Sequence, residues 1–484
     1  MQIVSVEFIC FFIVIMLIYH ALPARLRCPF LLMSSYFFYG SQNIRYLFFL
    51  IVATLFSYID ALLMNRFRDA LFYKKLVFII TIIFNLAMLG YFKYAGFLSG
   101  GRINSLLLPA GISFYLFMSC GYLADVYQGR IPVERNLFRY ALFVSFFPTI
   151  LSGPIERAGN MLPQFSTDFL KNVRFDTERI RNGFVRILWG YFMKLVLSDR
   201  ISILVTHVYA APEQYGGALL AVVSVLYTFR IYCDFAGYSH IMIGIAETLG
   251  IRLMENFRCP YLAESVADFW RRWHISLSSW FRDYIYIPLG GNRKGTVRKY
   301  CNVMIVFLLS GLWHGAGWTF IIWGGLHGLY QVIGALLMPV RRKVSELLKL
   351  DTHDGVQTRS LRVVRIAGTF LLVNFAWIIF QAENMEAVRN ICERFLHPKV
   401  WELFDGTFYT LGLDRPNVAL MFLGLLMLIM VDLFNEHGIF LSKHIAKERL
   451  WIRWPVYIGA ILLIGICGVW GSGYDTANFI YYRF

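Results

Sequence analysis

Residues 269–291 read FWRRWHISLSSWFRDYIYIPLGG and place a histidine, three arginines and an aspartate inside an otherwise strongly apolar chain. The histidine is His274, and a second one, His314, follows forty residues later in LSGLWHG. Ionisable side chains at membrane depth are costly, so they usually mark a site of chemistry or transport. These two histidines are therefore the first candidates for a functional site.

The composition around this stretch is that of a multi-pass membrane protein. Hydrophobic residues make up 58% of the 484 residues, aromatic residues 17% and charged residues only 16%. A helix needs about 20 apolar residues to cross a hydrocarbon core of roughly 30 Å. Because about a dozen stretches approach that length, the sequence predicts an all-α polytopic integral membrane protein with about 11–13 membrane helices and re-entrant segments.

Some of the apolar stretches are irregular. Residues 29–40, 137–153 and 300–315 are short and contain Pro, Gly or Ser, so we expect them to be broken or re-entrant helices beside a protein-walled cavity. Residues 263–289 have aromatic residues at three- and four-residue spacing, which predicts one helix at or just below the membrane interface. A purely interfacial anchor would need no chemistry, but it would not account for His274.

The net charge of +16 comes from short basic clusters between the apolar stretches. This pattern follows the positive-inside rule and argues against a nucleic-acid partner. It predicts one acidic loop on the outside, at residues 383–414. It predicts four basic loops in the cytoplasm, at residues 66–75, 293–299, 341–349 and 443–453. We expect the first apolar stretch, from Ile3, to remain as an anchor and the C-terminus to lie outside.

The eight cysteines show no paired spacing, so the sequence indicates neither a metal site nor a disulfide framework. No Gly-rich phosphate motif follows a strand-like segment, and no repeat of fixed period is visible. The absence of a repeat argues against the inverted halves of many transporters.

The residues around His314 favour a catalytic role for this histidine. Gly311, Gly315 and Gly317 flank it and permit a helix break or a close approach of backbone or ligand. A neutral imidazole in a dry cavity can accept a proton from an attacking hydroxyl. The alternative is a structural histidine that donates to a carbonyl, but His274 and His327 lie in the same third of the chain.

Several long strings carry a family resemblance. Besides the stretch around His274, they are LPAGISFYLFMSCGYLADVY (108–127), FFPTILSGPIER (146–157), YCDFAGYSHIMIGIAETLG (232–250) and LSGLWHGAGWTFIIWGGLHG (309–328). Together they resemble the membrane-bound O-acyltransferase superfamily. More narrowly, they resemble its bacterial branch, which holds the alginate O-acetyltransferase membrane component and homologues that acetylate peptidoglycan and cellulose. The resemblance extends from about residue 36 to the C-terminal FIYYRF.

This resemblance implies a fold. Its members form a ring of tilted helices around a central cavity with a cytoplasmic funnel for the acyl donor and an opposite funnel for the acceptor. We therefore expect a single membrane domain over residues 1–484. Its parts would be N-terminal helices over 1–100, a catalytic core over 101–340 and C-terminal helices over 341–484.

The resemblance also implies site residues. His314 corresponds to the essential histidine of the family and would be the base, His274 would be its partner, and His327 is a weaker, secondary candidate. We expect no metal site. Further residues are candidates for lining the cavity: Trp313, Trp273, Ser278, Arg282, Asp283, Tyr284 and Asp234. A structural ion pair of Asp234 with Arg230 or Arg282 is the alternative for that residue. Ser113, Ser152 and Ser310 are weaker candidates for a nucleophile, because serine in membrane helices usually bonds a carbonyl one turn back.

The activity that follows is O-acetyl transfer. We expect acetyl-CoA or another acetyl thioester as donor substrate, no bound cofactor, and an alginate-like exported polysaccharide as acceptor, with peptidoglycan or cellulose as alternatives. The family implies a lipid-embedded position in the bacterial inner membrane and an extracytoplasmic partner that resembles SGNH hydrolases. A different class stays open: an acyl or proton-coupled transporter that feeds a secreted transferase.

Overall fold

The fold is entirely helical in the part of the chain that the computed structural model describes, residues 1–99, 108–347 and 358–470. These residues form two compact units: unit 1 comprises Met1–Tyr191 and Tyr238–Glu255, and unit 2 comprises Phe192–Gly237 and the described part of Asn256–Tyr474. The predicted all-α fold is confirmed. The single domain over 1–484 and its three expected parts stay a prediction.

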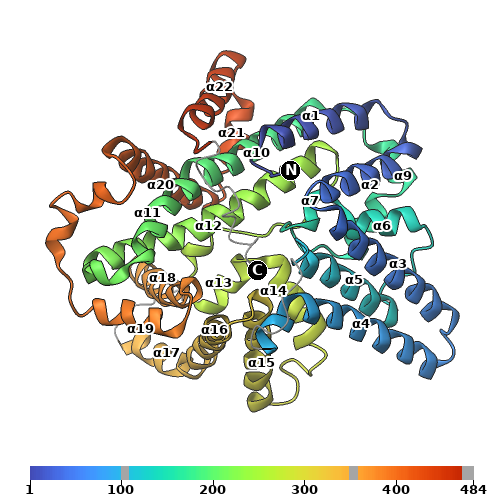
Figure 1. The fold of residues 1–484 in the computed structure, drawn as a ribbon, viewed down its shortest axis with the longest axis horizontal. Helices are drawn as coiled ribbons and strands as arrows, with labels where there is room; N and C mark the ends of the chain where they lie inside the picture. The colour runs from blue at the N-terminus through green and yellow to red at the C-terminus, as the bar shows by residue number, and fades with distance from the viewer. Residues whose placement is uncertain (100–107, 348–357, 471–484) are drawn as a thin grey trace. The chain divides into compact units, whose positions relative to one another are not determined.

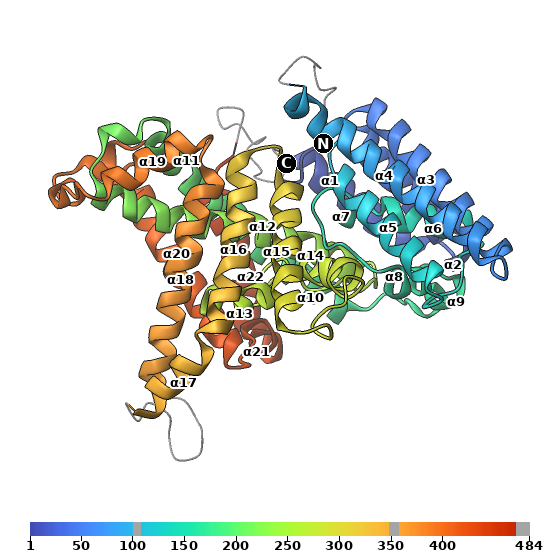
Figure 2. The same ribbon diagram turned by 90° about the horizontal axis from the view of Figure 1, so that it is seen from below.

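Unit 1 holds the N-terminal helices, and α2 to α6 pack beside one another within it (Figures 1 and 2). Its elements are α1 (Val6–Ala21), α2 (Ala24–Gly40), α3 (Ile44–Arg66), α4 (Leu71–Leu98), α5 (Ile112–Tyr127), α6 (Leu137–Ser145), α7 (Phe147–Ile150), α8 (Ala158–Gln164), α9 (Thr167–Asn172) and α10 (Thr177–Tyr191). The long helix α12 (Gly217–Thr248) begins in unit 2 and ends in unit 1.

Unit 2 holds the three histidines and the residues expected to line a cavity, whereas the weaker candidates Ser113 and Ser152 lie in unit 1. It contains η1 (Phe192–Ser198), α11 (Asp199–Ala210), η2 (Pro212–Gln214), η3 (Pro260–Leu262), α13 (Val266–Arg272), α14 (Ile275–Phe281), η4 (Arg282–Tyr286), α15 (Thr296–His314), α16 (Trp318–Leu336), α17 (Met338–Leu347), α18 (Arg359–Gln381), α19 (Met385–Arg394), η5 (Val400–Leu403), η6 (Thr407–Thr410), α20 (Arg415–Glu436), α21 (Leu441–Lys447) and α22 (Leu450–Cys467). Of these, η1 and η4 are π-helical and η2, η3, η5 and η6 are 3₁₀ turns.

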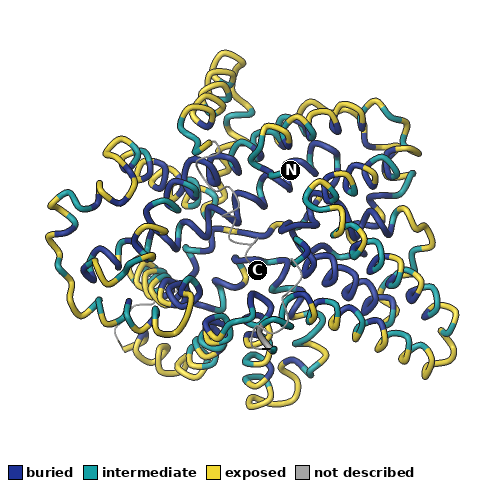
Figure 3. Tube along the Cα trace, in the orientation of Figure 1, coloured by how far each residue is buried: buried dark blue, intermediate teal, exposed yellow. Residues whose placement is uncertain are grey.

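Seven of the described helices are long and apolar enough to cross a membrane: α3, α4 up to Gly96, α12, α16, α18, α20 and α22. Their burial differs widely (Figure 3). In the most apolar 18-residue window of α12, 72% of the residues are buried, whereas in that of α22 only 6% are. Because apolar side chains exposed to water would be unfavourable, the open faces of α3, α4, α20 and α22 are expected to contact lipid. The chain is thus a multi-pass membrane protein.

The three stretches expected to be broken behave differently. Residues 137–153 do break, into α6 and α7, with Phe146 between them. The other two stretches are not broken, because α2 runs through Pro29 without interruption and α15 continues to His314. That they are re-entrant stays a prediction. A proline near the start of a helix removes only one early hydrogen bond, and membrane helices tolerate this. The expected outer C-terminus and part of the 341–349 loop lie outside the described residues.

Candidate active site

His314 is the last residue of α15, where the helix stops at Gly315 and the chain turns into α16. Glycines make this turn possible by letting the two helices approach closely. A Cβ at Gly311 would lie 2.3 Å from the carbonyl oxygen of Phe320, and one at Gly324 would lie 2.2 Å from that of Phe307. Larger residues would therefore force the helices apart. The expectation that glycines accompany a helix end at His314 is confirmed.

Aromatic rings enclose His314 on several sides. Its imidazole is 4% exposed, and its centroid lies 4.7 Å from the ring of Trp313, 5.0 Å from Trp323 on α16 and 5.3 Å from Phe380 on α18. The edge-on orientation of these rings is the one that aromatic pairs favour. The imidazole is therefore buried among aromatic rings from three helices that lie side by side in unit 2 (Figure 2).

His274 lies at a break in the polypeptide rather than within a helix. The sequence predicted one helix over 263–289, but α13 ends at Arg272, α14 begins at Ile275, and the stretch after Phe281 is π-helical. This prediction is wrong because His274 has φ 44°, in the left-handed region, which a non-glycine residue adopts only when its surroundings compensate for the strain.

Asn256 supplies that compensation. Its carbonyl accepts the Ile275 N–H at 3.0 Å. Its Oδ1 accepts the Ser276 N–H at 3.2 Å and the Ser276 hydroxyl at 2.8 Å, and it lies 3.2 Å from His274 Nδ1. Since a backbone N–H can only donate, the amide atom in this position is the oxygen, and His274 Nδ1 must donate to it. Neutral His274 thus carries its proton on Nδ1 and presents Nε2 as an acceptor.

The indole of Trp313 contacts both histidines. Its ring centroid is 6.0 Å from that of His274 and 4.7 Å from that of His314. On its other side, His274 packs edge-on against Phe235 of α12 at 4.6 Å. His274 lies outside the seven membrane-spanning helices, and its complete burial lowers its pKa to about 3, because desolvation disfavours the charged imidazolium. The structure thus gathers two buried histidines around one indole.

His327 belongs to the same aromatic cluster but has the opposite tautomer. Its Nδ1 accepts the indole N–H of Trp270 at 3.2 Å, and its ring lies 5.0 Å from Trp323, which also contacts His314. An indole N–H only donates, so neutral His327 carries its proton on Nε2. Among the described residues Nε2 has no hydrogen-bond partner. His327 therefore presents an N–H donor at Nε2, whereas a general base needs an unprotonated nitrogen that can accept a proton.

The remaining residues expected to line a cavity fall into two groups. Trp273 is buried and stacks on Phe269 at 5.5 Å, and its carbonyl accepts the Ser278 hydroxyl at 3.3 Å. The other group lies on η4, where Arg282 pairs with Asp283 at 2.9 Å and the ring of Tyr284 contacts Trp280 at 5.1 Å. That any of these residues lines a substrate cavity stays a prediction.

Asp234 takes part in a buried ion cluster in unit 2. Lys194 on the π-helix η1 lies 2.6 Å from Asp234 on α12 and 2.8 Å from Asp199 at the start of α11. Lys194, a residue that the sequence analysis had not singled out, is therefore a partner of Asp234, and the expected ion pair with Arg230 or Arg282 stays a prediction. Asp234 precedes Phe235, so this ion cluster fixes the turn of α12 that packs against His274.

Asn256 and Lys194 are the polar residues that sequence reasoning missed. Lys194 is a single charged residue among apolar neighbours, whereas Asn256 follows Glu255 in a polar stretch, and neither belongs to a motif. Their importance comes from partners 18 to 40 positions away, which no local pattern reveals. No group of three His, Cys, Asp or Glu residues that could hold a metal ion occurs in residues 1–99, 108–347 and 358–470.

Comparisons with known proteins point to one family. The model of the membrane-bound O-acyltransferase family matches residues 130–355, which include all three histidines. A probable alginate O-acetylase of Azotobacter vinelandii is 36% identical over 403 residues, covering 80% of this chain and 76% of that protein. A probable alginate O-acetylase of Pseudomonas aeruginosa is 36% identical over 428 residues, with coverage of 85% and 76%. A peptidoglycan O-acetyltransferase of Helicobacter pylori is 34% identical over 394 residues, with coverage of 75% and 72%.

Proposed function

Because the chain belongs to the membrane-bound O-acyltransferase family and is an acyltransferase, we propose that it takes an acetyl group from a cytoplasmic thioester and passes it across the membrane for O-acetylation of an exported polysaccharide. The observation that carries this proposal is the pair of buried histidines, His274 and His314, which both contact the Trp313 indole. A hydroxyl and a thioester carbonyl need such a dry site, because water there would hydrolyse the donor.

In the proposed reaction the acceptor hydroxyl oxygen attacks the acetyl carbonyl carbon, and His314 takes the hydroxyl proton. The C–O bond forms, the C–S bond breaks, and the leaving thiolate receives a proton, so the reaction needs no other reactant. His274, held by Asn256 with Nε2 as acceptor, orients a hydroxyl or relays its proton. His327 would hold the aromatic cluster in place through Trp270 and Trp323. No bound cofactor and no metal ion take part in these steps.

The donor would be acetyl-CoA or another acetyl thioester. Arg293 and Lys294 are exposed at the turn before α15, the helix that leads to His314, and Arg298 is exposed in its first turn. Cations at this end would attract a phosphate-bearing donor from the cytoplasm. The loop fits the positive-inside rule equally well, so a donor assay with charge variants is needed to separate the two roles.

The names of the relatives support a polysaccharide as the acceptor. Two are named as probable alginate O-acetylases and a third as a peptidoglycan O-acetyltransferase. We therefore place an alginate-like exopolysaccharide first, with peptidoglycan or cellulose as alternatives. The protein would act in the bacterial inner membrane with an extracytoplasmic SGNH-hydrolase-like partner that completes the transfer.

The proposal is tested by the acetyl ester content of exported polysaccharides in a deletion strain. The strain would carry the wild type, His314→Ala, His274→Ala or the control His444→Ala, an exposed histidine on α21, each at matched membrane abundance. We expect ester to disappear with the first two variants and to remain with the control. Full acetylation with His314→Ala would overturn the histidine mechanism. In that case a transporter that moves acyl groups or protons would be the better account.

A further inference from the structure

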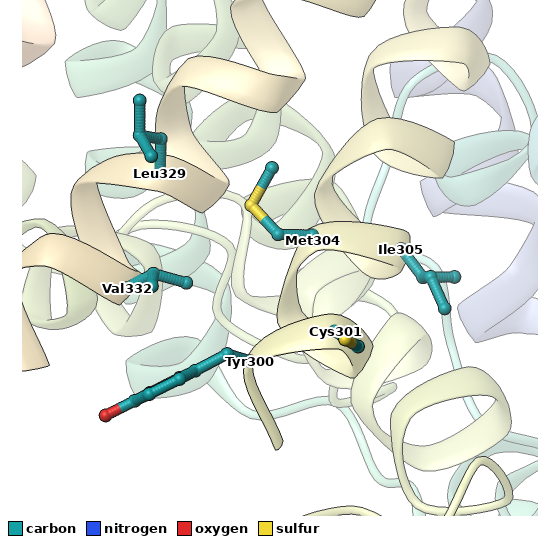
Figure 4. A pocket seen from close by; sticks show the side chains of 6 residues that line it. All are labelled: Tyr300, Cys301, Met304, Ile305, Leu329 and Val332. Carbon is teal, nitrogen blue, oxygen red and sulfur yellow. The ribbon is translucent and has the colours of Figure 1, made fainter. Parts of the chain in front are cut away.

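An open apolar groove runs between α15 and α16 in unit 2, toward the end of the helix pair that is opposite His314. It has a volume of about 530 Å³. Figure 4 shows the side chains that line it, all on these two helices: Tyr300, Cys301, Met304, Ile305, Leu329 and Val332. Every lining group is apolar except the phenol oxygen and the thiol. The shape and chemistry of the groove suit a linear hydrocarbon chain.

The groove lies toward one end of the helix pair. Near His314 the glycines of α15 and α16 pack backbone against backbone, and the last such position, Gly328, already faces the Met304 side chain. Beyond it, larger side chains separate the helices and form the groove. Because only Gly315–Gly317 link the two helices, they run antiparallel, so the start of α15 and the end of α16 share this end.

Cations gather at the same end. Residues 287–347 contain seven lysines and arginines outside the groove and a single acidic residue: Arg293, Lys294, Arg298, Lys299, Arg341, Arg342 and Lys343 against Glu346. Six of the seven are exposed and Lys299 is half-buried, with Nζ 5.7 Å from the Tyr300 ring centroid. Only Arg342 lies within ion-pair distance of Glu346. The mouth of the groove is therefore strongly basic.

From this combination we propose that the groove binds one acyl chain of an anionic phospholipid whose headgroup phosphate is held by Lys299 and Arg298. A basic rim beside an apolar groove at a membrane helix, here α16, is the arrangement that selects anionic headgroups. A zwitterionic lipid would also fill the groove, but the ammonium group of its headgroup would weaken its attraction to the cations. A soluble phosphate would use the cations without filling the groove. The inference does not depend on the acyl acceptor or on the proposed function.

Native mass spectrometry of the purified full-length protein tests the site. The protein would be released from nanodiscs that contain phosphatidylglycerol and phosphatidylcholine with identical acyl chains. We expect phosphatidylglycerol to be retained preferentially. The double variant Arg298→Gln/Lys299→Gln should lower that preference roughly tenfold or more, since each cation near the surface contributes on the order of 1 kcal/mol. The matched control Arg389→Gln/Lys443→Gln changes two cations distant in sequence and should retain the wild-type preference.

A second variant tests the groove itself. Cys301→Trp would fill the exposed groove wall without altering any charge, and its thermal midpoint would show whether it folds. We expect retention of phosphatidylglycerol to fall, with inorganic phosphate and glycerol phosphate unable to displace the lipid from the wild type. Equal retention of both lipids, unchanged retention in Cys301→Trp, or full displacement by glycerol phosphate would each overturn the proposal.

Discussion

The two central histidines are held in place by different means. His274 lies at a strained break between α13 and α14 and is fixed by hydrogen bonds that Asn256 accepts. His314 ends a regular helix and is fixed by aromatic rings and by glycines that let α16 approach. A polar clamp defines the tautomer of an imidazole, whereas an aromatic pocket defines only its position and its dryness. The difference indicates that His274 is the more precisely oriented of the two.

The largest effect should come from removing the histidines themselves. We expect His314→Ala to lower the rate of acetyl transfer about 10²–10⁴-fold, as loss of a general base does. If both histidines serve one step, His314→Ala/His274→Ala should be little worse than His314→Ala alone, because residues that act as a unit are not additive. The measurement is incorporation of labelled acetate into polysaccharide ester. Losses that multiply would show that the two histidines act independently.

The Asn256 clamp should have the next largest effect. Asn256→Ala leaves His274 without the partner that fixes its tautomer. The loss of a buried hydrogen bond is worth about 1–3 kcal/mol, or roughly ten- to hundredfold in rate. Asn256→Asp keeps the accepting oxygen and should restore much of the rate while shifting its pH profile. Equal rates for the alanine and aspartate variants at matched abundance would argue against an orienting role.

The glycine contact near His314 can be broken by a single methyl group. In Gly311→Ala the new Cβ would lie 2.3 Å from a backbone oxygen, and overpacking of this kind costs about 1–3 kcal/mol. We expect a lower thermal midpoint in detergent. Gly334→Ala on α16 is the control, because nothing lies within 4 Å of its Cβ position and alanine favours helix. A midpoint for Gly311→Ala equal to that of the control would show that the helices can move apart freely.

The smallest expected effect is a pH dependence of stability that His274 contributes. Unfolded histidine binds a proton near pH 6.5, whereas burial lowers the pKa of folded His274 to about 3. Between these values the unfolded state binds more protons, so stability falls as pH falls below about 6.5. The thermal midpoint of His274→Asn should therefore drop less between pH 7.5 and pH 5 than that of the wild type. The control His444→Asn should keep the wild-type pH slope, and an equal slope in both variants would contradict the assignment.

The comparison also shows how far the sequence could lead. Composition and apolar length predict an all-helical membrane protein because every backbone group in lipid must be bonded within a helix. The glycines around His314 likewise predict a local helix end. The break at His274 was not predictable, because residues 263–289 have helical periodicity and the break depends on Asn256. The sequence also did not predict that α2 continues through Pro29, because packing within unit 1 outweighs the local effect of the proline.

The Lys194–Asp234 ion pair bears on how the chain enters the membrane during synthesis. An aspartate in the middle of α12 is costly to place in lipid by itself. Lys194 and Asp199 precede Asp234 by 40 and 35 positions, so both are made before α12 emerges from the ribosome. Lys194 on η1 can therefore offer a positive charge to Asp234 when α12 reaches the membrane. The ion cluster therefore favours insertion of η1 and α12 into the membrane together.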